Sequence, residues 1–198
     1  MGSKRYSGSG GKREAQKRVK ARESGRRWKV YAPILTSLVV IGLVLALIHR
    51  GPSVGVAVGD VAPNSQFTLL NGTTTQLYNF KGHYLLLYFI TTWCDGCAEG
   101  LNQLSSYYPM LQARGVQVLV LESYNDLGYP GMELGKFVKQ FGNSNFTAGY
   151  ASYDMTLKYN SKAYPDVYYL ISPDGKVIYE GQDLSTGLGN LLTIMQKI

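Results

Sequence analysis

The sequence predicts an α/β domain with a mixed central sheet, flanking helices and an N-terminal β-hairpin, after one transmembrane helix. Three observations predict this fold class. An uncharged run from Val30 to Ile48 is long enough to cross a bilayer. Two apolar runs of strand length, Tyr84 to Ile90 and Val116 to Leu121, are typical of strands buried on both faces. Between them, from Cys97 to Arg114, apolar residues recur at helical spacing.

The other elements are predicted from turn residues and apolar spacing. Asn71-Gly72 between two alternating segments, 63–70 and 73–80, is typical of a β-hairpin. Asp154 is predicted to cap a short helix that ends at Tyr159. The remaining predicted elements are a helix at 132–141, strands at 167–171 and 177–180 joined by a tight turn, and a helix at 188–198.

Basic residues are concentrated at the N-terminus. The chain has a formal net charge of +7, but residues 1–29 contain 11 Lys/Arg and two acidic residues. The other 169 residues carry 9 Lys/Arg and 11 Asp/Glu, so the predicted domain lacks the basic surface that nucleic acid would require. The tail has few apolar residues, which predicts a disordered cytoplasmic segment.

Residues 30–48 are predicted to form an uncleaved membrane anchor. Nineteen residues at about 1.5 Å each span roughly 28 Å, about one hydrocarbon core. The basic residues before the span put the N-terminus in the cytoplasm and the domain outside it. A cleaved signal peptide is the alternative: the long basic segment argues against it, but the small residues at 56–59 keep it open. Residues 49–59 would be a linker and residues 60–198 the extracytoplasmic domain.

Cys94 and Cys97 are the only cysteines of the chain. They lie between a buried strand and a helix, in the sequence Trp-Cys-Asp-Gly-Cys. A tetrahedral metal site would need two more ligands, and neither His49 nor His83 is convincing, so no metal is expected. The pair is predicted to be a redox-active disulfide that needs no other cofactor; a buried structural pair is the alternative.

Cys94 is the predicted nucleophile. It falls at the N-terminus of the predicted helix, where free N–H groups and the helix dipole stabilise a thiolate. The negative charge of Asp95 acts the other way and would raise the pKa of Cys94. Cys97, one turn later, would attack the mixed disulfide and release the product. The same exchange runs in both directions, so the spacing does not give the direction of electron flow.

Over roughly residues 58–198 the chain resembles the thioredoxin superfamily. The resemblance is carried by Trp-Cys-x-x-Cys after a buried strand, by Tyr164-Pro165 before the strand at 167–171, and by Ser-Pro-Asp-Gly-Lys at 172–176. The hairpin and the single anchor make the chain most similar to the TlpA/ResA-like branch of membrane-anchored, extracytoplasmic thiol-disulfide oxidoreductases. The resemblance implies a thioredoxin-like fold with Pro165 in the cis form, facing the cysteines.

The resemblance also implies an activity, a groove and a partner. Pro165, Trp93 and the backbone of Tyr164 would shape a groove for an extended substrate chain. The activity would be reduction of cysteines in exported proteins, such as apocytochrome c or copper-site proteins. Reduction outside the cytoplasm needs electrons from across the membrane, so an integral-membrane thiol reductase is the expected partner.

Two carboxylate positions depart from the family pattern. Gly100 stands where many ResA-like reductases have a glutamate, and Tyr88 stands where thioredoxins have a buried aspartate. The usual proton-handling carboxylates are therefore missing or displaced. Glu122, at the end of a buried strand, and Glu99, beside Gly100, are the candidates for that task.

Other functions stay open from the sequence. A disulfide-forming oxidase or isomerase would use the same cysteines, and a non-catalytic membrane-tethered adaptor would use them only as a staple. Residues 91–94 match the Thr-x-x-Cys fragment of peroxiredoxins, but Leu87 stands where that motif has proline. Copper delivery on this fold needs a downstream histidine, and none follows His83.

Overall fold

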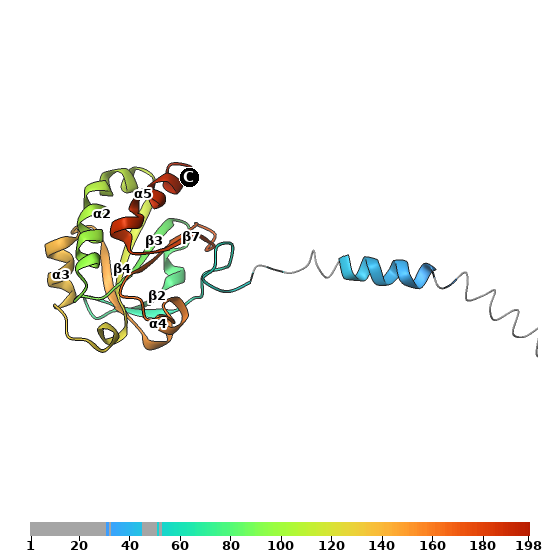
Figure 1. The fold of residues 1–198 in the computed structure, drawn as a ribbon, viewed down its shortest axis with the longest axis horizontal. Helices are drawn as coiled ribbons and strands as arrows, with labels where there is room; N and C mark the ends of the chain where they lie inside the picture. The colour runs from blue at the N-terminus through green and yellow to red at the C-terminus, as the bar shows by residue number, and fades with distance from the viewer. Residues whose placement is uncertain (1–30, 32, 45–50, 52) are drawn as a thin grey trace, which may run out of the picture. The chain divides into compact units, whose positions relative to one another are not determined.

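The computed structural model describes residues 31, 33–44, 51 and 53–198. The chain divides into two compact units, Met1–Gly51 and Pro52–Ile198. The predicted tail at 1–29 lies outside the described residues, as do residues 30, 32 and 45–48 of the predicted anchor. Residues 31 and 33–44 are helical (Figure 1). Within these described ranges, no helix has both the length and the apolar character needed to span a bilayer.

Strands and helices alternate along the second unit. The strands are β1 (Gln66–Leu69), β2 (Thr74–Gln76), β3 (Tyr84–Ile90), β4 (Val116–Glu122), β5 (Thr147–Ala151), β6 (Val167–Ile171) and β7 (Val177–Gln182). The α-helices are α2 (Asp95–Ala113), α3 (Leu134–Phe141), α4 (Tyr153–Tyr159) and α5 (Leu184–Met195). Two short 3-10 segments are η1 (Leu77–Phe80) and η2 (Tyr124–Gly128). The predicted positions of the hairpin, β3, α2, β4, α3, β6 and β7 are confirmed to within a few residues.

The seven strands form one mixed sheet in the order β2-β1-β5-β4-β3-β6-β7 (Figure 1). β3, β4 and β5 run parallel, and the other neighbours pair antiparallel. Parallel neighbours need long crossover connections, which contain α2 and α3. β3 and β4 are almost entirely buried, as expected of continuous apolar runs at the centre of a sheet.

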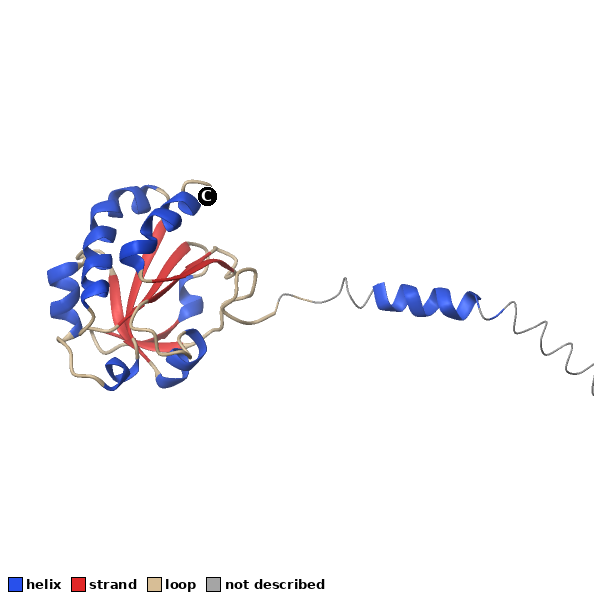
Figure 2. Ribbon diagram, viewed as in Figure 1, coloured by secondary structure: helices blue, strands red, loops and turns tan. Residues whose placement is uncertain are grey.

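Two apolar cores lie on the two faces of the sheet, because side chains alternate along each strand. The even-numbered residues of β3, Leu86 to Ile90, pack with α2, α3 and α5. The odd-numbered residues, Leu85 to Phe89, pack with η1 and α4. Helices therefore cover both faces of the sheet (Figure 2). Cys94 lies in the connection from β3 to α2, Cys97 in the first turn of α2, and Pro165 in the loop before β6.

The sequence does not predict β5. Its residues are mostly small, show no alternation and include Gly149. A side chain on Gly149 would collide with the backbone of Thr68, so glycine permits the close approach of β1. Pairing with β1 and β4 overrides the weak local propensity of the segment.

The N-cap of α4 also differs from the prediction. Ser152, not Asp154, caps the helix: its hydroxyl accepts a hydrogen bond from the Met155 amide at 3.1 Å. Asp154 lies in the first turn of the helix and pairs with Lys158 at 2.6 Å. Ser152 has extended backbone angles, which the cap position requires.

Residues 53–61 pack on the sheet. Val54 forms a β-bridge with Val61, and Val61 forms a second bridge with Lys176. The Gly59 amide donates to the Val177 carbonyl at 2.8 Å. Contacts with the sheet therefore begin inside the segment predicted as a linker, 49–59.

α2 and α5 approach each other closely at Gly100. A Cβ added there would lie 2.8 Å from the Tyr88 hydroxyl oxygen and 3.1 Å from the Leu184 Cβ. Tyr88 and the start of α5 thus fill the space into which a larger side chain at residue 100 would extend. The absence of a glutamate at this position follows from the packing.

We expect Gly100→Ala to lower the free energy of unfolding by about 1–3 kcal/mol, because the added methyl group overpacks the contact between α2 and α5. Gly189→Ala in α5 is the matched control, since no atom lies within 4 Å of its added Cβ. Alanine there should stabilise the helix by about 0.5–1 kcal/mol. Denaturant titration measures both values. Equal stability of the two variants would contradict the close approach at Gly100.

Candidate active site

Cys94 is the N-cap of α2. Its sulfur accepts a hydrogen bond from the backbone N–H of Cys97 at 3.1 Å. Cys94 is partly exposed, whereas Cys97 is fully buried, and both are free thiols. The Cys94 sulfur therefore lies where the N–H groups of the first helical turn stabilise a negative charge.

The two thiols have very different affinities for a proton. Hydrogen bonding with the Cys97 thiol is the largest cause that lowers the pKa of Cys94, to about 7, and backbone N–H groups add to it against the effect of burial. The opposing effect expected of Asp95 is not among these causes and stays a prediction. Hydrogen bonding with Cys94, followed by burial, raises the pKa of Cys97 far above its ordinary value. At neutral pH the pair combines a half-ionised accessible thiol with a protonated buried one.

Pro165 lies beside the cysteines, as the resemblance implies. The Cys97 thiol donates to the Pro165 carbonyl at 3.3 Å. No peptide bond in the described residues is cis, so the expectation of a cis Tyr164–Pro165 bond is wrong. An X–Pro bond favours trans by about 0.5–1 kcal/mol when its surroundings do not reverse this preference. Here the chain turns before the proline, at Ala163, whose φ of 53° is left-handed.

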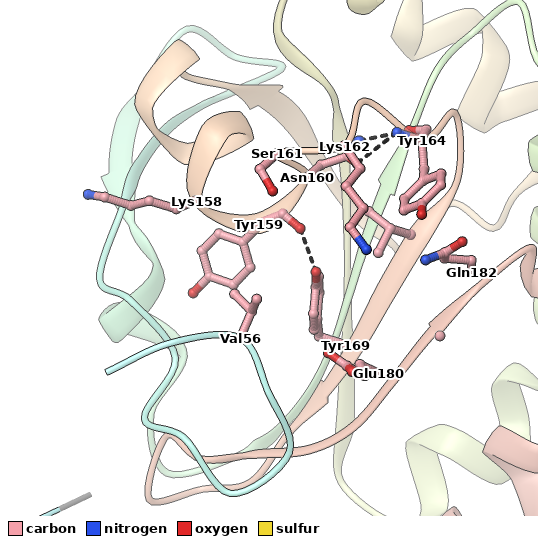
Figure 3. A pocket seen from close by; sticks show the side chains of 12 residues that line it. Val56, Lys158, Tyr159, Asn160, Ser161, Lys162, Tyr164, Tyr169, Glu180 and Gln182 are labelled. Carbon is pink, nitrogen blue, oxygen red and sulfur yellow. Dashed lines mark hydrogen bonds between the residues drawn. The ribbon is translucent and has the colours of Figure 1, made fainter. Parts of the chain in front are cut away.

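The backbone of Tyr164 is already hydrogen bonded within the chain (Figure 3). The Asn160 side-chain oxygen accepts from the Tyr164 N–H at 2.9 Å, and the Asn160 NH₂ group donates to the Tyr164 carbonyl at 2.7 Å. A substrate chain that uses these groups must first displace Asn160. Tyr164 also lines a cavity of about 290 Å³, with Lys162 and Glu180 on other walls.

Asp126 holds the segment that precedes Cys94. Its carboxylate accepts from the Thr92 N–H at 2.8 Å and from the Thr92 hydroxyl at 2.5 Å. The backbone carbonyl of Asp126 accepts from the indole N–H of Trp93 at 2.8 Å. The Tyr129 ring packs edge-on against the indole, with 5.1 Å between the ring centroids. These contacts fix Trp93 beside the cysteines.

The backbone at Asp126 is left-handed. Asn125, Asp126 and Leu127 have φ angles of 50°, 51° and 56°. Such angles cost roughly 1–2 kcal/mol per residue, and the hydrogen bonds of Asp126 to Thr92 and Trp93 offset part of that cost. The sequence predicts only a turn-rich loop here. Because Asn and Asp tolerate left-handed angles, the Asn-Asp pair was the available signal.

Asp166 is a second buried carboxylate that the sequence analysis missed. Its Oδ2 atom accepts from the Tyr88 hydroxyl at 2.7 Å and from the Leu184 N–H at 3.1 Å. The second bond satisfies the first turn of α5, which begins four residues before the predicted start. Burial raises the pKa of Asp166 to about 6, and the two hydrogen bonds oppose this shift only in part. A charged residue directly before an apolar strand was the available signal.

Neither predicted proton-handling carboxylate is hydrogen bonded to a cysteine in the described part of the chain. Glu99 is exposed and accepts from the Gln103 side chain at 2.9 Å. Glu122 ends β4 and is half-buried. Burial, and then the charges of Asp126 and Glu133, raise the pKa of Glu122 to about 7. The functions of Glu99 and Glu122 stay predictions.

The family model of the AhpC/TSA family matches residues 58–180. The chain belongs to the AhpC/TSA family. This AhpC/TSA protein is 30% identical over 111 residues to the thiol-disulfide oxidoreductase ResA of Geobacillus kaustophilus, an alignment that covers 56% of this chain and 62% of the relative. It is 31% identical over 123 residues to ResA of Bacillus thuringiensis subsp. konkukian, covering 62% and 68%. The resemblance to ResA-like proteins is confirmed.

The solved structure of a thioredoxin-like protein from Aeropyrum pernix shares the fold. The TM-score is 0.54 at 18% identity, over 82% of this chain and 99% of that chain. The expectation of a thioredoxin-like α/β fold is thereby confirmed. The AhpC/TSA chain spans about six-tenths of the length of the first two ResA relatives it matches.

We expect the alkylation rate of Cys94 to rise with pH, with a midpoint at the Cys94 pKa of about 7. Cys97→Ala removes the thiol donor and should raise this pKa, whereas Cys97→Ser keeps a hydroxyl donor and should change it less. The rates of reaction with iodoacetamide between about pH 5 and about pH 10 give the Cys94 pKa in the wild type and in the two variants. An unchanged pKa in Cys97→Ala would show that the backbone N–H groups alone stabilise the thiolate.

We expect Asp166 to make the protein less stable as pH rises. An unfolded aspartate titrates near about 3.9, and Asp166 in the folded protein titrates at about 6. The folded state therefore binds this proton more tightly. The resulting stability is fully present below about pH 4 and is lost as pH rises through about 6, at most about 3 kcal/mol.

Asp166→Asn should remove that part of the pH dependence. Denaturant titrations of wild type and variant at about pH 4.5 and about pH 8, on either side of the folded-state pKa of Asp166, measure the difference in their free energies of unfolding. Relative to wild type, the variant should gain stability at the higher pH. A difference that does not change with pH would contradict the raised pKa of Asp166.

Proposed function

We propose that the chain is a membrane-anchored thiol-disulfide oxidoreductase that reduces disulfides of exported proteins. The observation that carries the proposal is the unlike pair of thiols: partly exposed Cys94 at the start of α2, and buried Cys97 one turn later. The ResA relatives are thiol-disulfide oxidoreductases, and the similarity to them supports the same activity here. Apocytochrome c and copper-site proteins are the proposed substrates.

The proposed reaction has two exchange steps. The Cys94 thiolate attacks one sulfur of the substrate disulfide; a mixed disulfide forms, and the other substrate sulfur leaves as a thiolate. Cys97 then attacks the Cys94 sulfur, which forms the Cys94–Cys97 disulfide and releases the second substrate sulfur. The substrate gains two electrons, and the Cys pair loses two. An integral-membrane thiol reductase, the proposed partner, would return them.

The pKa of Cys94 supports reduction as the direction. A thiolate that is strongly stabilised favours the reduced protein and makes its disulfide a strong oxidant, as in DsbA with a pKa of about 3.5. Thioredoxin, a reductant, has a pKa of about 7. The Cys94 value of about 7 corresponds to the reductant.

The proposed substrate groove runs between Trp93 and the Tyr164–Pro165 segment. Trp93 is 36% exposed and Tyr129 is 64% exposed, so together they offer an aromatic surface beside Cys94. The cavity next to Tyr164 would receive a neighbouring side chain of the substrate. An extended substrate would replace Asn160 as the hydrogen-bond partner of the Tyr164 backbone.

We further propose the membrane topology expected from the sequence. Residues 30–48 carry no charge and follow a strongly basic segment, which supports an uncleaved anchor with its N-terminus in the cytoplasm. The apolar side chains of the helix at 33–44 are exposed, for example Leu38 at 60% and Val39 at 62%, and such a surface suits contact with lipid.

Peroxide reduction is a second candidate, favoured by the Thr-x-x-Cys fragment at 91–94. Two observations weaken it. The Thr91 hydroxyl donates its one proton to the Pro165 carbonyl at 3.5 Å, so it does not offer that proton to a peroxide oxygen. Among the described residues the single arginine, Arg114, lies at the C-terminal end of α2, opposite to Cys94. An arginine donor for a peroxide oxygen is therefore missing from the described surroundings of Cys94.

We expect Cys97→Ser to accumulate mixed disulfides with exported proteins, because the resolving thiol is gone. Cys94→Ser is the matched control and should trap none. Both full-length variants are isolated from membranes under alkylating conditions, and adducts released by dithiothreitol are identified. Equal trapping by the two variants would rule out Cys94 as the nucleophile, and normal cellular function of both would favour the adaptor.

The same full-length protein gives the direction of exchange. It is equilibrated in glutathione or dithiothreitol buffers, and its free thiols are counted by the mass added on alkylation. A reduction potential near or below about −250 mV would support a reductase, whereas one near about −120 mV would make the protein an oxidant.

A further inference from the structure

Disulfide exchange as proposed above leaves the buried carboxylate of Asp166 without a function. Its side chain is 7% exposed, and its Oδ1 atom is buried without a hydrogen-bond partner. Asp166 takes part in neither of the two ion pairs found among the described residues. A carboxylate that is buried and only half satisfied is costly to the fold, so its presence at this place calls for an explanation.

The backbone connects Asp166 directly to the buried thiol. The carbonyl that accepts the Cys97 thiol belongs to Pro165, and its peptide unit ends at the nitrogen of Asp166. Beyond the larger effects of hydrogen bonding and burial, the charge of Asp166 raises the pKa of Cys97 and of Cys94. Asp166 thus directly follows the residue whose carbonyl contacts the Cys97 thiol, and its charge acts on both thiols.

The other titratable groups that face Asp166 are poor proton acceptors. They are Tyr88 on β3, Tyr168 on β6 and Asp183 before α5. Burial raises the pKa of both tyrosines, which therefore stay protonated. Asp183 is exposed, and hydrogen bonds from nearby hydroxyls lower its pKa. Of these groups, Asp166 alone combines burial with a pKa near neutrality, at about 6.

We propose that Asp166 accepts the proton of the Cys97 thiol, through its unpaired Oδ1 atom, when Cys97 attacks the mixed disulfide. The proposal rests on the thiol-disulfide exchange described above. The S–H bond of Cys97 breaks and an O–H bond forms on Asp166. The freed electron pair of the sulfur forms the Cys94–Cys97 bond, and the substrate sulfur leaves Cys94 as a thiolate. Asp166 then gives its proton to solvent.

The transfer becomes favourable at the step that needs it. In the reduced protein, hydrogen bonding with Cys94 is the largest cause of the raised pKa of Cys97. In the mixed disulfide the Cys94 sulfur carries no charge, so this effect is lost. Burial and the charge of Asp166 still oppose ionisation of Cys97, and the second of these ends when Asp166 takes the proton. Meanwhile Tyr88 and Leu184 occupy Oδ2, which leaves Oδ1 for the proton.

A two-step reaction with Ellman's reagent tests the proposal. The reduced full-length chain, held in detergent, releases one coloured thiolate when Cys94 attacks the reagent and a second when Cys97 displaces it. The first rate depends on reagent concentration and the second does not. In Asp166→Asn we expect the first rate to stay within about twofold and the second to fall by about tenfold or more at neutral pH.

The pH profile separates proton transfer from a merely structural function of Asp166. The second rate of the wild type should rise through about pH 6 and level off, whereas that of Asp166→Asn should keep rising with hydroxide. Asp154→Asn, an exposed carboxylate on α4, is the matched control and should behave as wild type. Equal second rates and profiles in Asp166→Asn and wild type would overturn the proposal, as would a loss confined to Glu122→Gln.

Tyr88→Phe provides an independent measurement should Asp166→Asn fold poorly. It keeps the carboxylate but removes a hydrogen bond that lowers the pKa of Asp166, so the midpoint of the second-rate profile should move to higher pH. An unchanged midpoint would overturn the proposal. Failure of the proposed exchange would look different, since the wild type itself would then lack the second release.

Discussion

The hydrogen bond from the Cys97 thiol to the Pro165 carbonyl joins the two segments that make the site, although they lie 68 residues apart in the sequence. Each segment is fixed by a different part of the fold. Cys97 belongs to α2, which packs on the even-numbered face of β3, and Pro165 precedes β6, which pairs with β3 directly. β3 thus supports both segments.

Two buried aspartates hold the segments around this hydrogen bond. Asp126 fixes Thr92 and Trp93 on the N-terminal side of the cysteines. Asp166 fixes Tyr88 and the start of α5 behind them. The charge of Asp166 opposes formation of the Cys94 thiolate. Hydrogen bonding with the Cys97 thiol, and then with the N–H groups at the start of α2, outweighs it and lowers the pKa of Cys94.

The sequence predicts the central strands and α2 well, because long apolar runs and a regular helical stripe determine them locally. It misses β5, where Gly149 matters only because β1 comes close, and it misplaces the cap of α4 by two residues. It also misses the carboxylate near the cysteines. The family pattern points to residues 88 and 100, whereas Asp166 directly precedes β6 and accepts a hydrogen bond from Tyr88 on β3. A charged residue before an apolar strand is a local signal, but it does not reveal this contact, which depends on the pairing of β3 with β6.

The same limit applies to Tyr164, whose place before the proline suggested a free backbone. Asn160, four residues earlier, offers Tyr164 the same donor and acceptor that a peptide strand would offer. The side chain is therefore an internal competitor of any ligand that binds this way. The affinity measured for a ligand is the intrinsic affinity reduced by the fraction of time that Asn160 is displaced. A ligand held in this way leaves quickly, because the Asn160 side chain stays beside the Tyr164 backbone and can take its place again.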